Sequence, residues 1–204
     1  MPGDIHILTN TYTKIDPWFG REHQPVELDL GCGKGGFVLE LARRKAALVL
    51  GTDVMLGRLR KVARKAEREG LGNVEFLRTN SLDLIGYQLP DNCVQRIHLL
   101  CPDPWPKARH RHRRLATTDF LTRAARVLED GGIFHFATDD EDYRRQVLEI
   151  VEQLPCYIRD VDLAAISDVL DIETEFERRW REQGRPVPHD AFQVLKADNS
   201  TLIA

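Results

Sequence analysis

Short apolar runs alternate with amphipathic segments along most of the chain. Five runs are continuous enough to be strands buried on both faces: Val26–Leu30, Ala47–Gly51, Val74–Leu77, Val94–Leu100 and Ile133–Ala137. Strands of this kind belong to parallel sheets that carry helices on both sides. The pattern therefore predicts an α/β fold in which strand and helix alternate.

Helical spacing of apolar residues fills the segments between these runs. Helices are predicted over Gly35–Arg44, from Met55 to a stop at Gly70 and Gly72, from a Thr118 cap through Leu128, and from a cap at Asp139 or Asp140 to Leu154. The "EDGG" stretch after Leu128 is predicted to end the third helix. Two late strands, Tyr157–Val161 and Phe192–Leu195, are predicted to pair antiparallel.

Length and composition suit one domain. The 204 residues, 42% of them hydrophobic and 30% charged, predict a single unit over 1–204, with 1–18 as a short N-terminal extension. A formal net charge of -3 argues against a protein that coats nucleic acid, but it allows a local basic patch. No apolar run has the length of a signal peptide or membrane span, and the four cysteines lack CxxC spacing. We expect a cytoplasmic protein with no membrane contact, no metal and no evident partner subunit.

Polar residues follow the predicted strands at their carboxyl ends. Asp29 and a glycine loop close the first strand, Asp53 the second, Asn80 the third, the 101–114 loop the fourth and Asp139 the fifth. In a doubly wound sheet the carboxyl ends of parallel strands meet at one edge, where ligands bind. The sequence therefore predicts a ligand site at this edge.

The glycine loop "LDLGCGKGG" suits a nucleotide cofactor. Gly31 and Gly33 let the backbone approach a ligand closely, because glycine has no Cβ. Asp53 follows Gly31 by about 20 residues, where a carboxylate accepts hydrogen bonds from the ribose of NAD or of S-adenosylmethionine. Asp29 would repel a pyrophosphate and pair with an ammonium, which favours S-adenosylmethionine. A structural turn capped by Asp29 is the alternative.

A basic loop, "CPDPWPKARHRHRRL", occupies 101–115. Its prolines restrict the backbone and are expected to hold Asp103 and Trp105 at the sheet edge. Its cations suit a polyanion that arrives there: Lys107, Arg109, Arg111, Arg113 and Arg114. His110 and His112 have no acid or cysteine at ligand spacing, so they are predicted to be exposed or phosphate-side donors rather than metal ligands.

With "PDPWPKARHRHRRL", "LDLGCGKGGF", "FATDDEDY" and "TEFERRWREQGRPV" in this order, the sequence resembles the tRNA (guanine-N7-)-methyltransferase family from about Phe19 to Val194. The resemblance implies a class I, Rossmann-like methyltransferase fold. Such a fold has a seven-stranded, mostly parallel sheet with helices on both faces, and it takes S-adenosylmethionine as methyl donor. It also implies tRNA as the RNA bound, methylated at the guanine of position 46 in its variable loop.

The same resemblance assigns residues to roles. The donor positions it implies are Asp29, Gly31, Gly33, Asp53, Asn80 and Asp103, and Asp103 also matches the catalytic position. The tRNA positions it implies are Lys107, Asp139, Thr174, Glu175, Phe176 and Glu177; the charge pattern of the loop adds Arg109 and Arg111. Asn80 stands where many members carry an acid, although an amide can also bond to adenine.

Guanine N7 carries a free lone pair, so the implied reaction needs positioning and charge stabilisation rather than a strong base. Asp103 could accept hydrogen bonds from the guanine edge, with Asp139 sharing that task and Trp105 stacking on a splayed base. Two alternatives remain open. One is a class I methyltransferase for a protein or small molecule, and the other is a catalytically silent RNA-binding protein of the same fold.

Replacing Asp53 tests the donor assignment directly. Asp53→Ala should weaken donor binding by roughly 1–3 kcal/mol, because charge-assisted hydrogen bonds to the ribose are lost. The affinity for tRNA should stay nearly unchanged. Calorimetry on folded variant protein measures both, and an unaltered donor affinity would remove Asp53 from the site.

Overall fold

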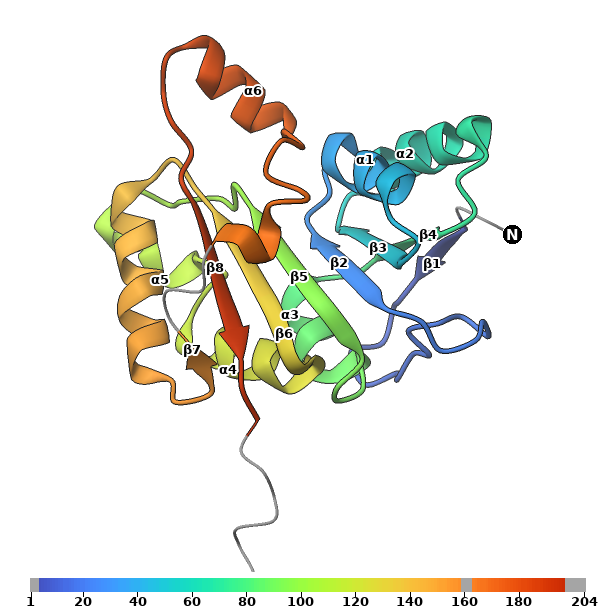
Figure 1. The fold of residues 1–204 in the computed structure, drawn as a ribbon, viewed down its shortest axis with the longest axis horizontal. Coiled ribbons are helices and arrows are strands. Elements are labelled where there is room, and N and C mark those ends of the chain that lie inside the picture. Colours follow the sequence, from blue (N-terminus) through green and yellow to red (C-terminus); the bar gives the residue numbers. More distant parts are fainter. Residues whose placement is uncertain (1–3, 159–162, 197–204) are drawn as a thin grey trace, which may run out of the picture.

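The computed structural model describes residues 4–158 and 163–196, which are organised around one eight-stranded sheet (Figure 1). The strand order is β1-β4-β3-β2-β5-β6-β8-β7, and only β8 runs antiparallel to its neighbours. The strands are β1 (Ile5–Ile7), β2 (Val26–Leu30), β3 (Leu48–Asp53), β4 (Val74–Arg78), β5 (Val94–Leu100), β6 (Leu128–Ala137), β7 (Tyr157–Ile158) and β8 (His189–Val194).

Helices connect the strands and cover both faces of the sheet. They are α1 (Gly36–Arg44), α2 (Leu56–Glu69), the short α3 (Ser81–Asp83), α4 (Thr118–Val127), α5 (Glu141–Gln153) and α6 (Glu175–Glu182). The predicted class I fold with its seven strands, β4-β3-β2-β5-β6-β8-β7, is present, and β1 adds an eighth strand at the edge. None of the helices in the described ranges is both long and apolar enough to span a bilayer.

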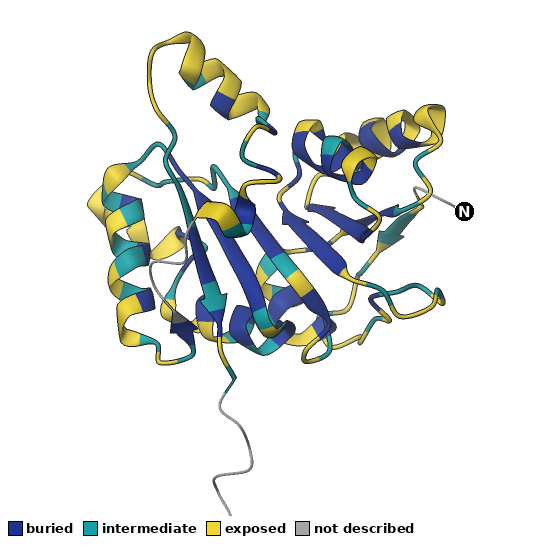
Figure 2. Cartoon of the chain, in the orientation of Figure 1, coloured by how far each residue is buried: buried dark blue, intermediate teal, exposed yellow. Residues whose placement is uncertain are grey.

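Two apolar layers hold the helices against the sheet. Residues of α4 and α5 pack on one face around Phe120, Phe134 and Tyr143, whereas α1 and α2 pack on the other around Phe37 and Leu59. Strands β2 and β3 are buried along their whole length and are dark blue in Figure 2. Burial on both faces explains why these strands read as continuous apolar runs in the sequence.

The N-terminal residues differ from the predicted extension. Ile5–Ile7 pairs in parallel with β4, and the His6 ring stacks on Phe19 and contacts the buried carboxylate of Glu75 at 3.1 Å. A three-residue strand has too little pattern to be seen in the sequence. Its pairing depends on the open edge of β4, which only the folded sheet provides.

Three predicted boundaries shift. Thr117, rather than Thr118, caps α4 by accepting from the backbone N–H of Phe120, and Asp140 caps α5. The "EDGG" stretch follows the last residue of α4 by two positions and lies within β6, where the register with β5 shifts: Val94 pairs with Leu128, but Arg96 pairs with Ile133, so the extra residues belong to β6. β7 covers Tyr157–Ile158, and the rest of the predicted 157–161 strand lies outside the described residues.

Helix α6 stands apart from both layers. It projects over the carboxyl ends of the central strands, above the gap between β5 and α1 in Figure 1. Glu177 is the one buried side chain among its residues. A helix with so little apolar burial has to be held by polar contacts.

Candidate active site

The glycine loop after β2 forms the floor of the site. Gly31, Gly33 and Gly35 have φ angles of 77°, 56° and 82°, in the left-handed region that other residues rarely adopt. A Cβ at Gly35 would lie 2.4 Å from a methyl carbon of Val62, so this glycine also allows α1 and α2 to pack closely. The space above Gly31 is open. The loop is therefore shaped to leave room for a ligand.

A cavity of about 220 Å³, the donor cavity, lies between this loop and the start of α6. Its lining brings together five predicted site residues: Asp29, Gly31, Gly33, Thr174 and Glu175. Phe176, a sixth, lines it as well. Residues 145 positions apart in the chain thus meet in one pocket because α6 folds back over the sheet edge.

Asp29 is the most unusual group in the donor cavity. It is 3% exposed, and its Oδ2 atom has no hydrogen-bond partner among the described residues. Burial, and then the charges of Glu177 and Asp53, raise the pKa of Asp29 to about 7. A buried, unsatisfied carboxyl at the wall of a cavity fits a ligand that brings a positive charge and hydrogen-bond donors.

Asp53 and Asn80 extend the site beyond the donor cavity. Asn80 lines a second cavity of about 220 Å³ together with Val54. Asp53, at the end of β3, lies between the two: its neighbour Val54 lines the second cavity, and Arg58, 3.6 Å from its carboxylate, lines the donor cavity. Asn80 also caps α3 by accepting from the N–H of Leu82 at 2.8 Å. An extended ligand with a polar centre matches this arrangement.

The loop after β5 is held in a strained shape. Cys101 and Trp105 have φ angles of 49° and 43°, which are unfavourable for residues with a side chain. Arg114 secures the loop from beneath: it is 2% exposed, donates to the Pro104 carbonyl at 2.7 Å and forms an ion pair with Asp142 at 2.9 Å. Arg114 is therefore a structural cation of this loop, and its partner acids, Asp140 and Asp142, lie at the start of α5.

The other loop residues are arranged around Trp105. Its ring meets His110 edge-on at 5.9 Å, and the Arg113 guanidinium lies 4.9 Å from it. Asp103 is exposed, and its carboxylate has no ion pair among the described residues. Lys107 and Arg109 are exposed and equally unpaired there, whereas Arg111 lies 3.0 Å from Asp142.

The α6 residues have different roles in the structure. Thr174 and Glu177 form a capping box, in which each side chain accepts a hydrogen bond from the other residue's backbone N–H. Glu175 forms an ion pair with Lys34 of the glycine loop, and Phe176 is 57% exposed. Asp139 is half-buried after β6. Glu177 therefore faces inward, while Glu175 and Phe176 face the donor cavity and solvent.

Several residues that line the donor cavity are not among the site residues predicted from the sequence. Arg179 and Arg58 line the donor cavity, together with Phe37 and Cys101. Arg179 follows Glu175 by one helical turn, so the helical period of α6 was an available signal for it. No comparable signal exists for Arg58, whose side chain reaches the cavity only because α2 packs beside the glycine loop.

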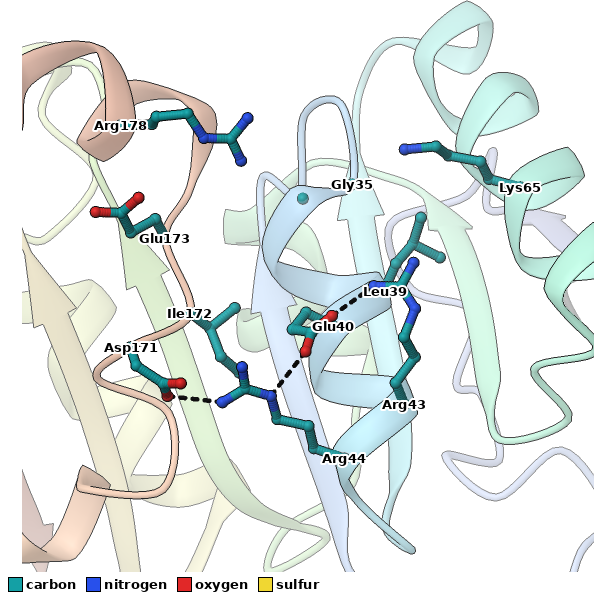
Figure 3. A pocket seen from close by; sticks show the side chains of 11 residues that line it. Gly35, Leu39, Glu40, Arg43, Arg44, Lys65, Asp171, Ile172, Glu173 and Arg178 are labelled. Atoms are coloured by element: carbon teal, nitrogen blue, oxygen red, sulfur yellow. Dashed lines mark hydrogen bonds and ion pairs between the residues drawn. The ribbon is translucent and has the colours of Figure 1, made fainter. Parts of the chain in front are cut away.

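A larger cleft, of about 350 Å³, separates α6 from α1 and α2. In Figure 3, Arg178 of α6 and Lys65 of α2 point toward one another across Gly35. Deeper in the cleft, Arg44 bridges Glu40 and Asp171. The cleft thus has a cationic mouth and a charge-paired floor. Within the residues that the structure describes, no group of three or more His, Cys, Asp or Glu could hold a metal ion.

Comparisons with known proteins add a family to this geometry. A family model described as "Putative methyltransferase" matches residues 16–189. A tRNA (guanine-N(7)-)-methyltransferase of Christiangramia forsetii is 34% identical over 95% of this chain and 90% of its own length. One of Thermotoga maritima is 36% identical over 82% of this chain, and the match spans 53% of that relative's length.

Solved structures share the fold at low sequence identity. The 16S rRNA methyltransferase KamB aligns with a TM-score of 0.63 over 86% of this chain and 90% of its own, at 18% identity. The [4+2]-cyclase SpnF aligns with a TM-score of 0.58 over 86% of this chain and 76% of its own, at 15% identity. A cyclase and a methyltransferase on one fold show that the reaction has to be argued from the site.

The ionisation of Asp29 can be measured through ligand binding. Because the pKa of Asp29 is about 7 in the free protein, S-adenosylmethionine should release close to one proton from it on binding at pH 6 and little at pH 8. Calorimetry in two buffers of different ionisation enthalpy measures this release. Asp29→Asn should abolish the pH 6 release and weaken binding by about 1–3 kcal/mol.

The same variant has a stability signature. A carboxyl whose pKa is raised by folding stabilises the protein when protonated, so the wild type should lose stability as the pH rises from about 4 to about 7. Asp29→Asn should lack that loss and melt at a higher temperature than the wild type at pH 8. Equal proton release by both proteins, together with parallel melting curves across pH, would contradict the assignment.

Proposed function

The chain belongs to the methyltransferase family that includes the tRNA (guanine-N(7)-)-methyltransferases, and from that premise we propose that it methylates guanine N7 in tRNA with S-adenosylmethionine. The site we propose for methylation is position 46 of the variable loop. The observation that carries the proposal is the unpaired, buried oxygen of Asp29 in a cavity floored by left-handed glycines.

Each donor-site residue is proposed to contact a different part of S-adenosylmethionine. Asp29 would pair with the ammonium of the methionine end, Gly31 and Gly33 would lie against it, and Asp53 would accept from the ribose. Asn80, in the second cavity, would hydrogen-bond to the adenine. S-adenosylmethionine supplies an electrophilic methyl group that a guanine lone pair can accept without a base. A cation suits an edge where Asp29, Asp53 and Glu177 are all buried acids.

Asp103 is proposed to orient the guanine. Its exposed carboxylate, at the rim of the sheet edge, could accept from the N1–H and the amine of the base and offset the positive charge that develops on the purine. Asp139, after the adjacent strand, would share this role. Trp105, two residues after Asp103 and itself in a strained backbone conformation, could stack on a splayed base.

The cationic surface for tRNA is proposed to be wider than the 101–115 loop. In that loop Arg111 and Arg114 are paired with Asp142, which leaves Lys107, Arg109 and Arg113 for phosphates, although Arg113 also lies against the Trp105 ring. A second set of exposed cations, none with a carboxylate partner among the described residues, lies on one face of α2: Arg60, Lys61, Arg64, Lys65 and Arg68. Like charges one helical turn apart cost a helix roughly 0.2–0.5 kcal/mol a pair. A bound polyanion would offset that cost.

Two rival functions remain: methylation of a protein or small molecule, and RNA binding without catalysis. The basic surface of α2 and the loop favours an RNA acceptor, and the unpaired Asp29 favours a protein that still binds the donor. Four free cysteines and an RNA substrate agree with a reducing, cytoplasmic compartment. Incubation of labelled donor with unmodified tRNA, and with a transcript in which guanine 46 is replaced by adenine, separates these possibilities.

The outcome of that experiment is specific. The proposed function predicts that only the tRNA with guanine at position 46 is labelled. The chemistry specific for 7-methylguanine should then cleave the RNA strand at that position. Donor binding without RNA labelling would indicate another acceptor. RNA binding without donor binding would indicate a silent protein.

Asp103→Asn tests the chemistry. The amide keeps the shape but loses the charge, so single-turnover methyl transfer should fall by about 10²-fold or more, while donor affinity falls less. The matched control is Asp91→Asn. Asp91 is exposed and precedes β5, at the end of the strand opposite the carboxyl edge, so this variant should keep the wild-type rate. Transfer by Asp103→Asn at the wild-type rate would reduce Asp103 to a structural loop residue.

Salt dependence of binding tests the cationic surface. Each phosphate contact contributes roughly -0.7 to -0.9 to the slope of log affinity against log salt, so a double variant should flatten it by about 1.5. We expect this for Arg60→Ala with Arg64→Ala and for Lys107→Ala with Arg109→Ala. Arg111→Ala should change it less because Asp142 already neutralises that side chain.

Arg123→Ala is the control, since Arg123 is paired with Asp119 on α4. Its slope should match the wild type. If the α2 variant has the same slope of log affinity against log salt as the wild type, α2 faces solvent in the complex. An unchanged slope for the loop variant would mean the same of the loop.

A further inference from the structure

A row of three histidines, of which His98 and His135 are buried and His189 is half-buried, crosses the sheet beneath α6. His98 of β5, His135 of β6 and His189 of β8 are joined ring to ring, with Nδ1 to Nδ1 at 2.9 Å and Nε2 to Nδ1 at 2.8 Å. A buried carboxylate closes each end: Glu27 lies 3.1 Å from His98, and Glu177 lies 2.9 Å from His189. We call these five residues the histidine row.

The number of protons in the histidine row follows from its geometry. Its four contacts each need one hydrogen, because two facing lone pairs repel at these distances. Burial would raise the pKa of Glu27 and of Glu177, but hydrogen bonds with His98 and with His189 hold both below the ordinary value, so both are carboxylates and bring no hydrogen. Three neutral imidazoles bring one hydrogen each, which makes three. One ring therefore has to be an imidazolium for every contact to be a hydrogen bond. The row holds two negative charges and one positive charge in a buried space.

The charged ring is best placed at His189. Glu27 is already flanked by Lys45 at 3.6 Å and Arg96 at 3.8 Å, so that end has its compensating charge. Burial lowers the pKa of His98, and burial together with the two neighbouring rings lowers the pKa of His135 well below its ordinary range. These groups disfavour a proton on the first two rings.

The Glu177 end needs that charge. Burial alone would raise the pKa of Glu177, but its hydrogen bonds with His189 and Thr174 hold it below its ordinary value. The charged groups that face this end are Asp29 across the donor cavity, and Glu173, Arg181 and Arg185 around the adjoining cavity. Arg181 is paired with Glu173 at 3.0 Å, and the Arg185 guanidinium stacks on Trp180. His189 is thus the cation that meets Glu177 directly.

This ion pair is what attaches α6 to the sheet. Glu177 is the buried residue of the helix, and its second oxygen accepts from the Thr174 backbone at 2.6 Å, at the residue where α6 begins. The residues that follow, Glu175, Phe176 and Arg179, line the donor cavity. The position of the cavity wall therefore depends on the charge state of Glu177's partner.

We propose that the histidine row is a positioning device, in which one shared proton at His189 seats α6 over the donor cavity. The identity of the ligand rests on the proposed function, whereas the seating of α6 does not. Removal of the proton leaves one of the four contacts without a hydrogen and leaves Glu177 charged and uncompensated near Asp29. The attachment of α6 over the donor cavity is complete when the histidine row carries this proton. It is lost as the pH rises through the midpoint of the titration that removes the proton.

Nitrogen-15 NMR of labelled histidines tests the proton count directly. The chain has seven histidines, so the signals of the row are assigned by their absence in His98→Gln, His135→Gln and His189→Gln. At pH 6.5 these three signals should comprise one imidazolium with both nitrogens protonated, at His189, and two neutral rings, at His98 and His135. Raising the pH should remove one proton from the row in a single step. Amide hydrogen exchange over α6 should accelerate at that same midpoint.

Two variants separate positioning from simple stability. His189→Gln should weaken S-adenosylmethionine binding about tenfold near pH 7 and remove the high-pH decline in affinity. Glu177→Gln keeps the capping box, since glutamine also serves there, and needs no cation. Once the base-catalysed intrinsic rate of amide exchange is divided out, the protection of its α6 amides should no longer change with pH. His23→Gln, at an exposed histidine far from the row, should behave as the wild type.

The outcomes distinguish this inference from the proposed function. Three neutral rings at pH 6.5, or an α6 exchange rate in His189→Gln that follows the wild type across pH, would overturn the positioning device. Failure of the wild type to bind S-adenosylmethionine would overturn the proposed function instead, and the NMR and exchange data would still decide the inference, because neither measurement uses a ligand.

Discussion

Buried negative charge at the carboxyl edge of the sheet is the constraint around which the site is built. Asp29, Asp53 and Glu177 are each less than 10% exposed, and Asp29 has an oxygen with no partner. Burial of an unpaired carboxylate costs free energy because it disfavours the charged form, and for this reason the pKa of Asp29 is raised. In our two proposals a cation compensates this negative charge at two places: the imidazolium of His189 beside Glu177, and the donor beside Asp29.

The rest of the fold keeps these acids from relaxing toward water. Two apolar layers fix the strands, and the left-handed glycines bring the backbone close beneath the cavity without a side chain to fill it. Beside the cavity, Arg114 ties the strained 101–105 segment to α5 through Pro104 and Asp142. Rigid elements thus surround a site whose own groups are poorly satisfied, as is common where binding energy has to be available for a ligand.

Electrostatics of the surface and of the site have opposite signs. The interior edge is acidic, the chain as a whole carries a net charge of -3, and yet the face of α2 and the mouth of the α6 cleft are cationic. A substrate that is both a polyanion and a bearer of a base that becomes positive during reaction suits this combination. Its backbone would meet the outer cations, and its base would meet the inner acids.

The sequence by itself determined the parallel α/β sheet and the edge where its strands end, because parallel strands and glycine turns leave local patterns; the class I fold followed from the family resemblance. The same local patterns indicated Asp29, Asp53 and the 101–115 loop. Only the tertiary structure decided which charged side chains form ion pairs within the protein and are therefore not free for a ligand. Arg111 and Arg114 look like free cations in the sequence but meet Asp142, and Glu177 looks like a surface acid but meets His189. Such pairs join residues far apart in the chain, and their energy depends on distance and burial, which no local pattern records.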